Sequence, residues 1–212
     1  MKLNNILDAI FPKGLTCNGC GKELNEDESY FSLCKNCEKL LYRVKSPVDI
    51  DGAEVHSVFE YDNLVRKFVL DYKDSDKPYL CEYMAKYLYV YCLEKGLDFD
   101  AVCYVPSSPS AIKRRGYDGM EIVAEEFALL TGKDLKKSLF RRDGADQTKV
   151  EHDKRAANVK DKFLSRSGYD GTILLLDDVV TTGATVRECA KVILSHGADK
   201  VIVLTFAAAR VK

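Results

Sequence analysis

A segment in the last third of the chain carries residue types that together could hold a phosphorylated ligand. The aliphatic run 173–176 has the pattern of a strand buried on both faces, and it leads directly into Asp177 and Asp178. In open α/β sheets, ligands bind at the carboxyl ends of such strands. Hydroxyl side chains and Gly183 follow, just before a predicted helix whose free N–H groups and positive dipole end favour a phosphate.

The two adjacent aspartates indicate the other part of the ligand. Asp177 and Asp178 would repel a phosphate, so they are better suited to the vicinal hydroxyls of a sugar or to a hydrated magnesium ion. The segment therefore predicts a site for a phosphorylated sugar. The alternative is a plain strand-to-helix turn with a threonine cap and a solvated acid pair. It is disfavoured because strand, acids, hydroxyls, glycine and helix occur here in register.

Four of the eight cysteines form two matched pairs near the N-terminus. Cys17 and Cys20 are one Cys-x2-Cys pair, Cys34 and Cys37 are the other, and thirteen residues separate them. Two such pairs can supply the four thiolates of a closed, tetrahedral structural zinc site. The alternative, a redox dithiol, would normally lie on a strand-to-helix turn of a larger fold. The pattern therefore predicts structural Zn²⁺, held in a module at residues 1–47 that begins with a helix.

The elements that must position the acid pair are predicted from hydrophobic periodicity. A strand at 172–176, a helix at 184–195 and a strand at 200–206 form a parallel βαβ unit. Further strands are expected at 55–61 and 99–105, and helices at 62–72, 78–95 and 116–131. Residues 48–212 are thus expected to form one α/β domain with a parallel sheet. The charged stretch 133–166 receives no assignment.

The segment from Ile173 to Thr185 resembles the motif with which type I phosphoribosyltransferases bind 5-phosphoribosyl-1-pyrophosphate (PRPP). The resemblance implies that Asp177 and Asp178 hold the ribose 2- and 3-hydroxyls and are the candidate catalytic residues, with Mg²⁺ accompanying PRPP. It also implies which residues hold the 5-phosphate: Thr181, Thr182, Gly183, Ala184 and Thr185. The family has a pyrophosphate loop after an earlier strand, and its counterpart here is the turn that contains Ser107 and Ser108.

Three further features, together with the paired cysteines, resemble the ComF family of DNA-uptake proteins, over nearly the whole chain. They are the run from Lys113 to Asp118, a spaced set between Arg142 and Phe163, and a set between Tyr61 and Lys73. The chain departs from the family where Arg-Gly-Phe-Asn-Gln becomes Arg-Gly-Tyr-Asp-Gly at 115–119. A second departure replaces Val-Pro-Val-Pro with Tyr-Val-Pro-Ser at 104–107. Asp118 and Gly119 replace two amides and are expected to alter hydrogen bonding near the ligand, whereas neither departure touches the 5-phosphate loop.

Basic side chains could neutralise the pyrophosphate that the resemblance implies, since concentrated phosphate charge calls for Lys and Arg. The candidates are Arg115, Lys73 and Arg155. For Lys113 and Arg114, a solvated basic surface is the better interpretation. Arg155 lies in the stretch 133–166, which holds eleven Lys and Arg against six Asp and Glu and could close over the ligand.

Composition limits the remaining possibilities. The chain has 212 residues and a formal net charge of −1, so nucleic-acid binding would have to come from a local basic patch. No run reaches the roughly 18 apolar residues of a membrane span, and the N-terminus lacks the pattern of a signal peptide. We therefore expect a cytoplasmic protein without membrane insertion. The four scattered cysteines are expected to be small buried hydrophobes.

Two functions remain open. In the first, the ComF resemblance implies a PRPP-binding protein that supports uptake or processing of single-stranded DNA in competence, with single-stranded DNA and a helicase-like protein as partners. In the second, the chain is an active phosphoribosyltransferase of nucleotide salvage or synthesis that displaces pyrophosphate at the anomeric carbon. The partner of the cysteine module is also open: nucleic acid, another protein or the parent domain.

Overall fold

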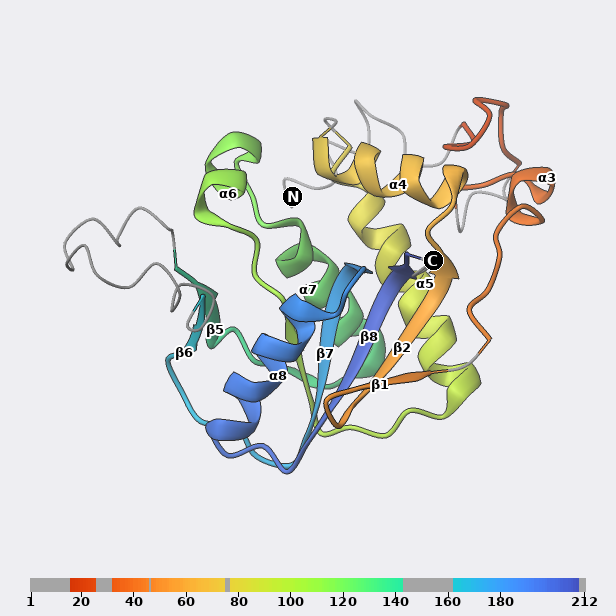
Figure 1. The fold of residues 1–212 in the computed structure, drawn as a ribbon. Helices are drawn as coiled ribbons and strands as arrows, with labels where there is room; N and C mark the ends of the chain where they lie inside the picture. Colours follow the sequence, from red (N-terminus) through yellow and green to blue (C-terminus); the bar gives the residue numbers. More distant parts are fainter. Residues whose placement is uncertain (1–15, 26–31, 46, 75–76, 143–161, 210–212) are drawn as a thin grey trace.

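The computed structural model of the chain describes residues 16–25, 32–45, 47–74, 77–142 and 162–209. Its centre is a six-stranded sheet in the order β1-β2-β8-β7-β3-β4, parallel except for the β1–β2 hairpin (Figure 1). A separate two-stranded sheet pairs β5 with β6. The strands are β1 (Val48–Ile50), β2 (Ala53–Glu60), β3 (Ala101–Tyr104), β4 (Asp134–Leu135), β5 (Leu139–Arg141), β6 (Phe163–Ser165), β7 (Thr172–Val180) and β8 (Lys200–Ala208).

Helices cover both faces of the six-stranded sheet, so the predicted α/β fold with a parallel sheet is confirmed (Figure 1). The helices are α3 (Lys35–Glu38), α4 (Asn63–Asp74), α5 (Leu80–Lys95), α6 (Pro109–Arg115), α7 (Gly119–Thr131) and α8 (Ala184–Ser195). Alternate residues of β7 enter the two layers: Leu174 and Leu176 pack on the side of α5 and α7, whereas Ile173 and Leu175 pack on the side of α8. Helix α5 is buried along most of its surface because it contacts the sheet, α4 and α7.

The strand that carries the acid pair is longer than predicted. The helix predicted at 184–195 coincides with α8, but the strand predicted at 172–176 continues to Val180. Pairing with β8 extends as far as Val180, whereas β3 pairs with β7 only up to Leu176. Asp177 and Asp178 therefore lie inside the last residues of the strand, supported by a neighbouring strand on one side only.

The described parts of the unassigned stretch 133–166 form the edge strand β4 and the hairpin-like pair β5–β6. Leu139 pairs with Ser165, and the backbone N–H of Arg142 donates to the carbonyl of Lys162 at 2.9 Å. These contacts bring the two ends of segment 143–161 together. The segment itself, with Arg155, lies outside the described residues.

The chain leaves β3 and β7 in opposite directions along the sheet. After β3 it passes through α6 and α7 to β4, and after β7 it passes through α8 to β8 on the other side. Helices α7 and α8 lie on opposite faces (Figure 1). The carboxyl ends of these two neighbouring strands therefore flank a topological switch point, which is where open α/β sheets bind ligands.

Among the described helices, none has both the length and the apolar character needed to span a membrane.

Candidate functional site

Asp178 is held by a cation from another part of the chain. Lys73, in the last turn of α4, donates to both carboxylate oxygens of Asp178, at 2.8 Å to Oδ2 and 2.9 Å to Oδ1. The hydroxyl of Tyr72, which is fully buried, donates to Oδ2 at 3.4 Å. The predicted ligand-binding residue Lys73 therefore lies at the acid pair itself, although 105 positions separate it from Asp178 in sequence.

Asp177 occupies a different environment on the opposite face of the same strand. It is in register with Thr205 of β8, which is in register with Ser57 of β2, and the hydroxyls of Ser57 and Thr205 lie 2.7 Å apart. Its Oδ1 accepts the backbone N–H of Asp178 at 2.8 Å. Burial, and then the charge of Asp178, raise the pKa of Asp177 well above its usual value. The two carboxyls are therefore not equivalent, because Asp178 has a cation partner and the pKa of Asp177 is raised.

The predicted phosphate loop lies where β7 ends and α8 begins. Gly183 is the N-cap of α8 and has a φ of 76°, a conformation that strains any residue with a Cβ. A Cβ at this position would also lie 2.5 Å from Cδ1 of Ile50 in β1. The N-cap residue has no capping side chain, and the hydroxyl of Thr182 accepts the N–H of Ala184 at 3.4 Å, so the following N–H groups of the first turn can bind an anion. The remaining loop residues are exposed: Thr181, Thr182, Ala184 and Thr185.

The turn after β3 is organised by one buried carboxylate. Asp118 accepts the backbone N–H of Ser107 at 2.9 Å and the hydroxyl of Ser107 at 2.8 Å. Arg115 donates from Nη2 to the same hydroxyl at 3.4 Å, while its buried Nη1 has no hydrogen-bond partner in the described part of the chain. Ser108 caps α6, since its hydroxyl accepts the N–H of Ala111 at 3.2 Å.

Asp118 and Gly119 also fix the start of α7. Besides holding Ser107, Asp118 is the N-cap of α7 and accepts the N–H of Met120 at 3.1 Å. Gly119 leaves room for the ring of Tyr72, because a Cβ there would lie 2.5 Å from Tyr72 Cε2. The sequence predicted a helix at 116–131 and so placed Asp118 inside it, whereas α7 begins at Gly119 with Asp118 as its N-cap. The Tyr72 ring connects this turn to Asp178.

The four paired cysteines come together as predicted, and they could bind a metal such as zinc. Their four Sγ atoms all lie within 4.8 Å of one another. Cys17 and Cys20 lie in a tight turn in which Gly21 donates its N–H to the carbonyl of Cys17 at 2.8 Å, and Cys34 and Cys37 lie at the start of α3. The two pairs approach closely, with 3.7 Å between Sγ of Cys20 and Sγ of Cys34.

The environment of Cys17 suits a thiolate, the form that binds metal. Burial alone would raise the pKa of this thiol. Backbone N–H groups of Cys34, Cys20 and Gly19 outweigh that effect and lower the pKa of Cys17 to about 6. Gly19 lets the turn of the first cysteine pair approach Cys37 closely, since a Cβ at position 19 would lie 2.7 Å from Sγ of Cys37. Outside the cluster, the scattered cysteines are buried as predicted: Cys81, Cys92, Cys103 and Cys189.

Comparisons with known proteins find similarity only among solved structures. No family model matches the chain, and no curated protein matches it. One similar structure is the allosteric regulatory enzyme of purine biosynthesis, with 18% identity, a TM-score of 0.46, and coverage of 64% of this chain and 29% of that one. Another is the glutamine PRPP amidotransferase from B. subtilis, with 17% identity, a TM-score of 0.46, and coverage of 64% and 30%.

Adenine phosphoribosyltransferase from Leishmania tarentolae is also similar, with 12% identity, a TM-score of 0.40, and coverage of 87% of this chain and 89% of that one. The chain spans less than a third of the length of the first two structures, at 29% and 30%. At TM-scores of 0.40 to 0.46 these similarities carry no argument about function, which has to be inferred from the site itself.

We expect Gly119→Ala to destabilise the protein. The new methyl group would overlap the Tyr72 ring, which is fully buried and cannot move into solvent. Overpacking of this kind typically costs about 1–3 kcal/mol of unfolding free energy. The measurement is urea unfolding of wild type and variant. An unchanged midpoint and slope would show that the ring has room to move aside.

For the cysteine cluster we expect about one zinc ion per chain, lost in Cys34→Ser because three thiolates leave the coordination sphere open. Elemental analysis by mass spectrometry measures the metal content. Cys92→Ala is the matched control, since it removes a buried cysteine outside the cluster and should keep the zinc. Full zinc content in Cys34→Ser would refute the assignment, and a titratable disulfide in wild type would favour the redox alternative.

Proposed function

We propose that the chain binds PRPP with Mg²⁺ at the carboxyl edge between β3 and β7. The observation that carries this proposal is the position of three unlike groups at one topological switch point. They are the acid pair at the end of β7, the start of α8, and the Ser107–Arg115 turn after β3. Tyr72 lies close to the first and third of these groups, because its hydroxyl donates to Asp178 and its ring lies against Gly119, the neighbour of the Asp118 that holds Ser107.

Each group suits one part of PRPP. The exposed residues Thr181, Thr182, Ala184 and Thr185, with Gly183, can place hydroxyl and N–H donors around a 5-phosphate. Asp177 and Asp178 can hold the ribose hydroxyls or magnesium. Arg115 and Lys73 can neutralise the pyrophosphate, and Ser107 and Ser108 can form hydrogen bonds with it; the buried Nη1 of Arg115 has no partner among the described residues. Arg155 belongs to the same proposal but lies outside the described residues.

The same arrangement supports catalysis as the alternative to binding alone. In phosphoribosyl transfer, the bond between the anomeric carbon and the pyrophosphate oxygen breaks, pyrophosphate leaves with the electron pair, and an acceptor base bonds to the carbon. Asp177 and Asp178, next to the ribose, would stabilise the developing positive charge. Release of pyrophosphate in the presence of nucleobases distinguishes an active transferase from a PRPP-binding protein.

We expect isothermal titration to detect binding of PRPP with Mg²⁺ to wild type, and the affinity to fall at least about tenfold in Asp178→Asn. The substitution removes the charge that holds the diol or the metal and leaves Lys73 without its partner. Asp134→Asn is the matched control, because Asp134 is an exposed aspartate far from the site. It is the first residue of β4 and pairs with Ala101, so it lies at the amino ends of the strands and not at their carboxyl ends. Equal affinities in wild type and Asp178→Asn would refute the role of the acid pair.

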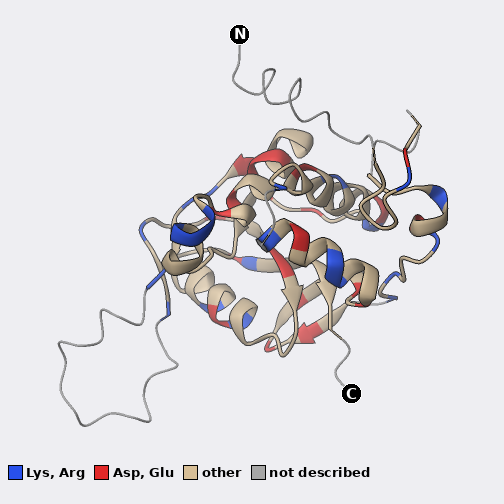
Figure 2. Cartoon of the chain, turned by 90° about the horizontal axis from the view of Figure 1, so that it is seen from above, with Lys and Arg blue, Asp and Glu red and all other residues tan. Residues whose placement is uncertain are grey.

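We further propose the role that the ComF resemblance implies, in which the protein supports uptake or processing of single-stranded DNA. The observation that favours it is a group of cations on the β5–β6 pair, which we call the basic hairpin: Arg141, Arg142, Lys162 and Arg166. Over the described elements in general, basic and acidic residues are interspersed (Figure 2). Among the described residues, the basic hairpin is therefore a local group of cations on a chain with a net charge of −1.

Contacts within the basic hairpin indicate how it would bind. Arg166 lies over the ring of Phe140 at 4.6 Å, and Arg141 lies over the ring of Phe163 at 5.7 Å. These arginines therefore already cover the aromatic faces on which bases would stack. Binding would depend on phosphate contacts, which makes it weakly sequence-dependent and sensitive to salt. If DNA is not contacted directly, the competence role would have to operate through a helicase-like protein partner.

We expect single-stranded DNA to bind at low ionic strength with an affinity that falls as salt rises. Combined replacement of Arg142, Lys162 and Arg166 by Ala should reduce the slope of log K against log[salt] by about 2, since each single-strand phosphate contact contributes about 0.7. Fluorescence anisotropy across a salt series measures this slope. Lys113→Ala is the control, because Lys113 is an exposed cation on α6. Absence of salt-dependent binding in wild type would refute direct contact.

A further inference from the structure

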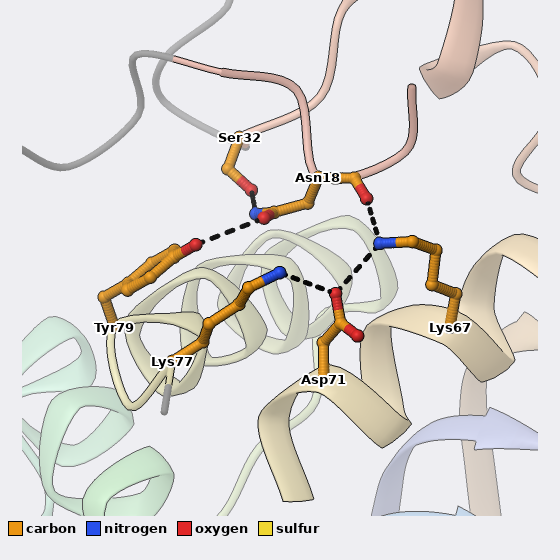
Figure 3. A network of polar contacts seen from close by, with 6 residues as sticks. All are labelled: Asn18, Ser32, Lys67, Asp71, Lys77 and Tyr79. Carbon is orange, nitrogen blue, oxygen red and sulfur yellow. Dashed lines mark hydrogen bonds and ion pairs between the residues drawn. The ribbon is translucent and has the colours of Figure 1, made fainter. Parts of the chain in front are cut away.

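Asn18, which lies between Cys17 and Cys20, forms hydrogen bonds from the turn of the first cysteine pair to the body of the protein. Its backbone carbonyl accepts a hydrogen bond from Lys67 of α4 at 2.7 Å. Its side-chain oxygen accepts the hydroxyl of Tyr79, just before α5, at 3.3 Å. Its side-chain nitrogen donates to the hydroxyl of Ser32, which precedes the second cysteine pair (Figure 3).

Lys67 does not act alone, because Asp71 fixes it from the next turn of α4. Asp71 accepts hydrogen bonds from Lys67 and from Lys77, each at 2.9 Å (Figure 3). These contacts lower the pKa of Asp71, although its burial would raise it. Lys77 belongs to the connection between α4 and α5. One carboxylate therefore joins α4, this connection and the cysteine turn into a single polar cluster.

Apolar packing holds the same two parts together. A Cβ at Gly19 would lie 3.1 Å from Cδ1 of Leu64, at the start of α4. Cys17 and Cys34 belong to the same hydrophobic cluster as Val65 and Phe68 of that helix. The side of α4 that faces the cysteine turn is thus fixed by both polar and apolar contacts.

The end of α4 reaches the acid pair. Lys73 is two residues beyond Asp71, so the two side chains leave the helix about 200° apart. Asp71 accepts hydrogen bonds from Lys67 and Lys77 beside the cysteine turn, whereas Lys73 contacts Asp178. Helix α4 is therefore a rigid connection between the four-cysteine cluster and the candidate ligand site.

We propose that the four-cysteine module sets the position of α4 and, through it, the contact between Lys73 and Asp178, so that a metal ion on the cysteines strengthens ligand binding at the acid pair. A metal bound to all four cysteines would fix the turn that contains Asn18 against the segment that begins at Ser32. Without the metal, this turn loses its strongest cross-link, and Lys67 loses a fixed partner. The ligand part of this inference rests on the proposed function, but the effect on Lys73 does not.

The first experiment measures Lys73 directly and needs no ligand. An amine-reactive acetylating reagent labels the full-length protein with and without bound zinc, and mass spectrometry gives the labelling rate of each lysine. We expect removal of zinc by a chelator to raise the rate at Lys73 by about fivefold or more, the lower range of typical couplings between sites. Lys137 is the internal control, because it is also ion-paired, to Glu121 and Glu125, but on α7.

The second experiment removes the polar contacts of Lys67 from this connection without changing a residue of either site. Lys67→Met removes the contacts to Asn18 and Asp71, while Lys137→Met removes two ion pairs from a lysine of equal exposure, 45% against 46%. We expect both variants to keep about one zinc per chain. In Lys67→Met, Lys73 should react rapidly even with zinc bound, and zinc removal should change its rate little. In Lys137→Met, the response of Lys73 to zinc should match that of wild type.

Titration with PRPP and Mg²⁺ then tests the ligand part. Zinc removal should weaken PRPP binding by about fivefold or more in wild type and in Lys137→Met, but not in Lys67→Met. An unchanged Lys73 rate on zinc removal would overturn the proposal. An equal rise at Lys73 and Lys137 would do so as well, since it would show that the metal only keeps the whole chain folded. If wild type binds no PRPP, the proposed function fails, while the labelling result still decides whether the cysteines control Lys73.

Discussion

The pairing of β7 with β8 beyond the point where β3 ends is the constraint on which the candidate site depends. Because backbone hydrogen bonds to β8 continue as far as Val180, the two aspartates are held in extended geometry with their side chains on opposite faces. Because β3 pairs with β7 only up to Leu176, no described strand pairs with the two aspartates on that side, and the hydroxyl of Tyr72 reaches Asp178. A loop in place of this strand end would not give the two carboxyls such different surroundings.

Much of the central architecture could be predicted because its signals are local. Hydrophobic periodicity marks three elements: the aliphatic run 173–176, the helix after Gly183 and the run after Lys200. The spacing of the two cysteine pairs by itself predicts a metal cluster. Short elements such as β4, with two residues, carry no such signal, since only pairing with β3 makes them strands. Strand β7 was predicted too short because two aspartates disfavour strand formation in isolation, and pairing with β8 overrides this preference.

Contacts between distant parts of the chain were beyond sequence reasoning. Lys73 was a candidate for the pyrophosphate, but its ion pair with Asp178 joins residues 105 positions apart. The Lys67 contact with Asn18 spans 49 positions, so the placement of the cysteine turn on α4 could not be foreseen. A boundary between a module at 1–47 and a domain at 48–212 remains a proposal. In the structure, Cys17 and Leu33 share one hydrophobic cluster with Val65 and Phe68.

The β5–β6 pair has a consequence for how this protein can vary in evolution. Its antiparallel pairing and the 2.9 Å hydrogen bond between Arg142 and Lys162 fix both ends of the intervening segment in one place. The entropy of holding two points of a chain together grows only logarithmically with the number of residues between them, by about 0.6 kcal/mol for each doubling. A change in the number of residues between Arg142 and Lys162 therefore adds little to the entropic cost of this pairing. Selection on this segment can act on what it binds, with its length and composition free to diverge faster than the sheet that carries it.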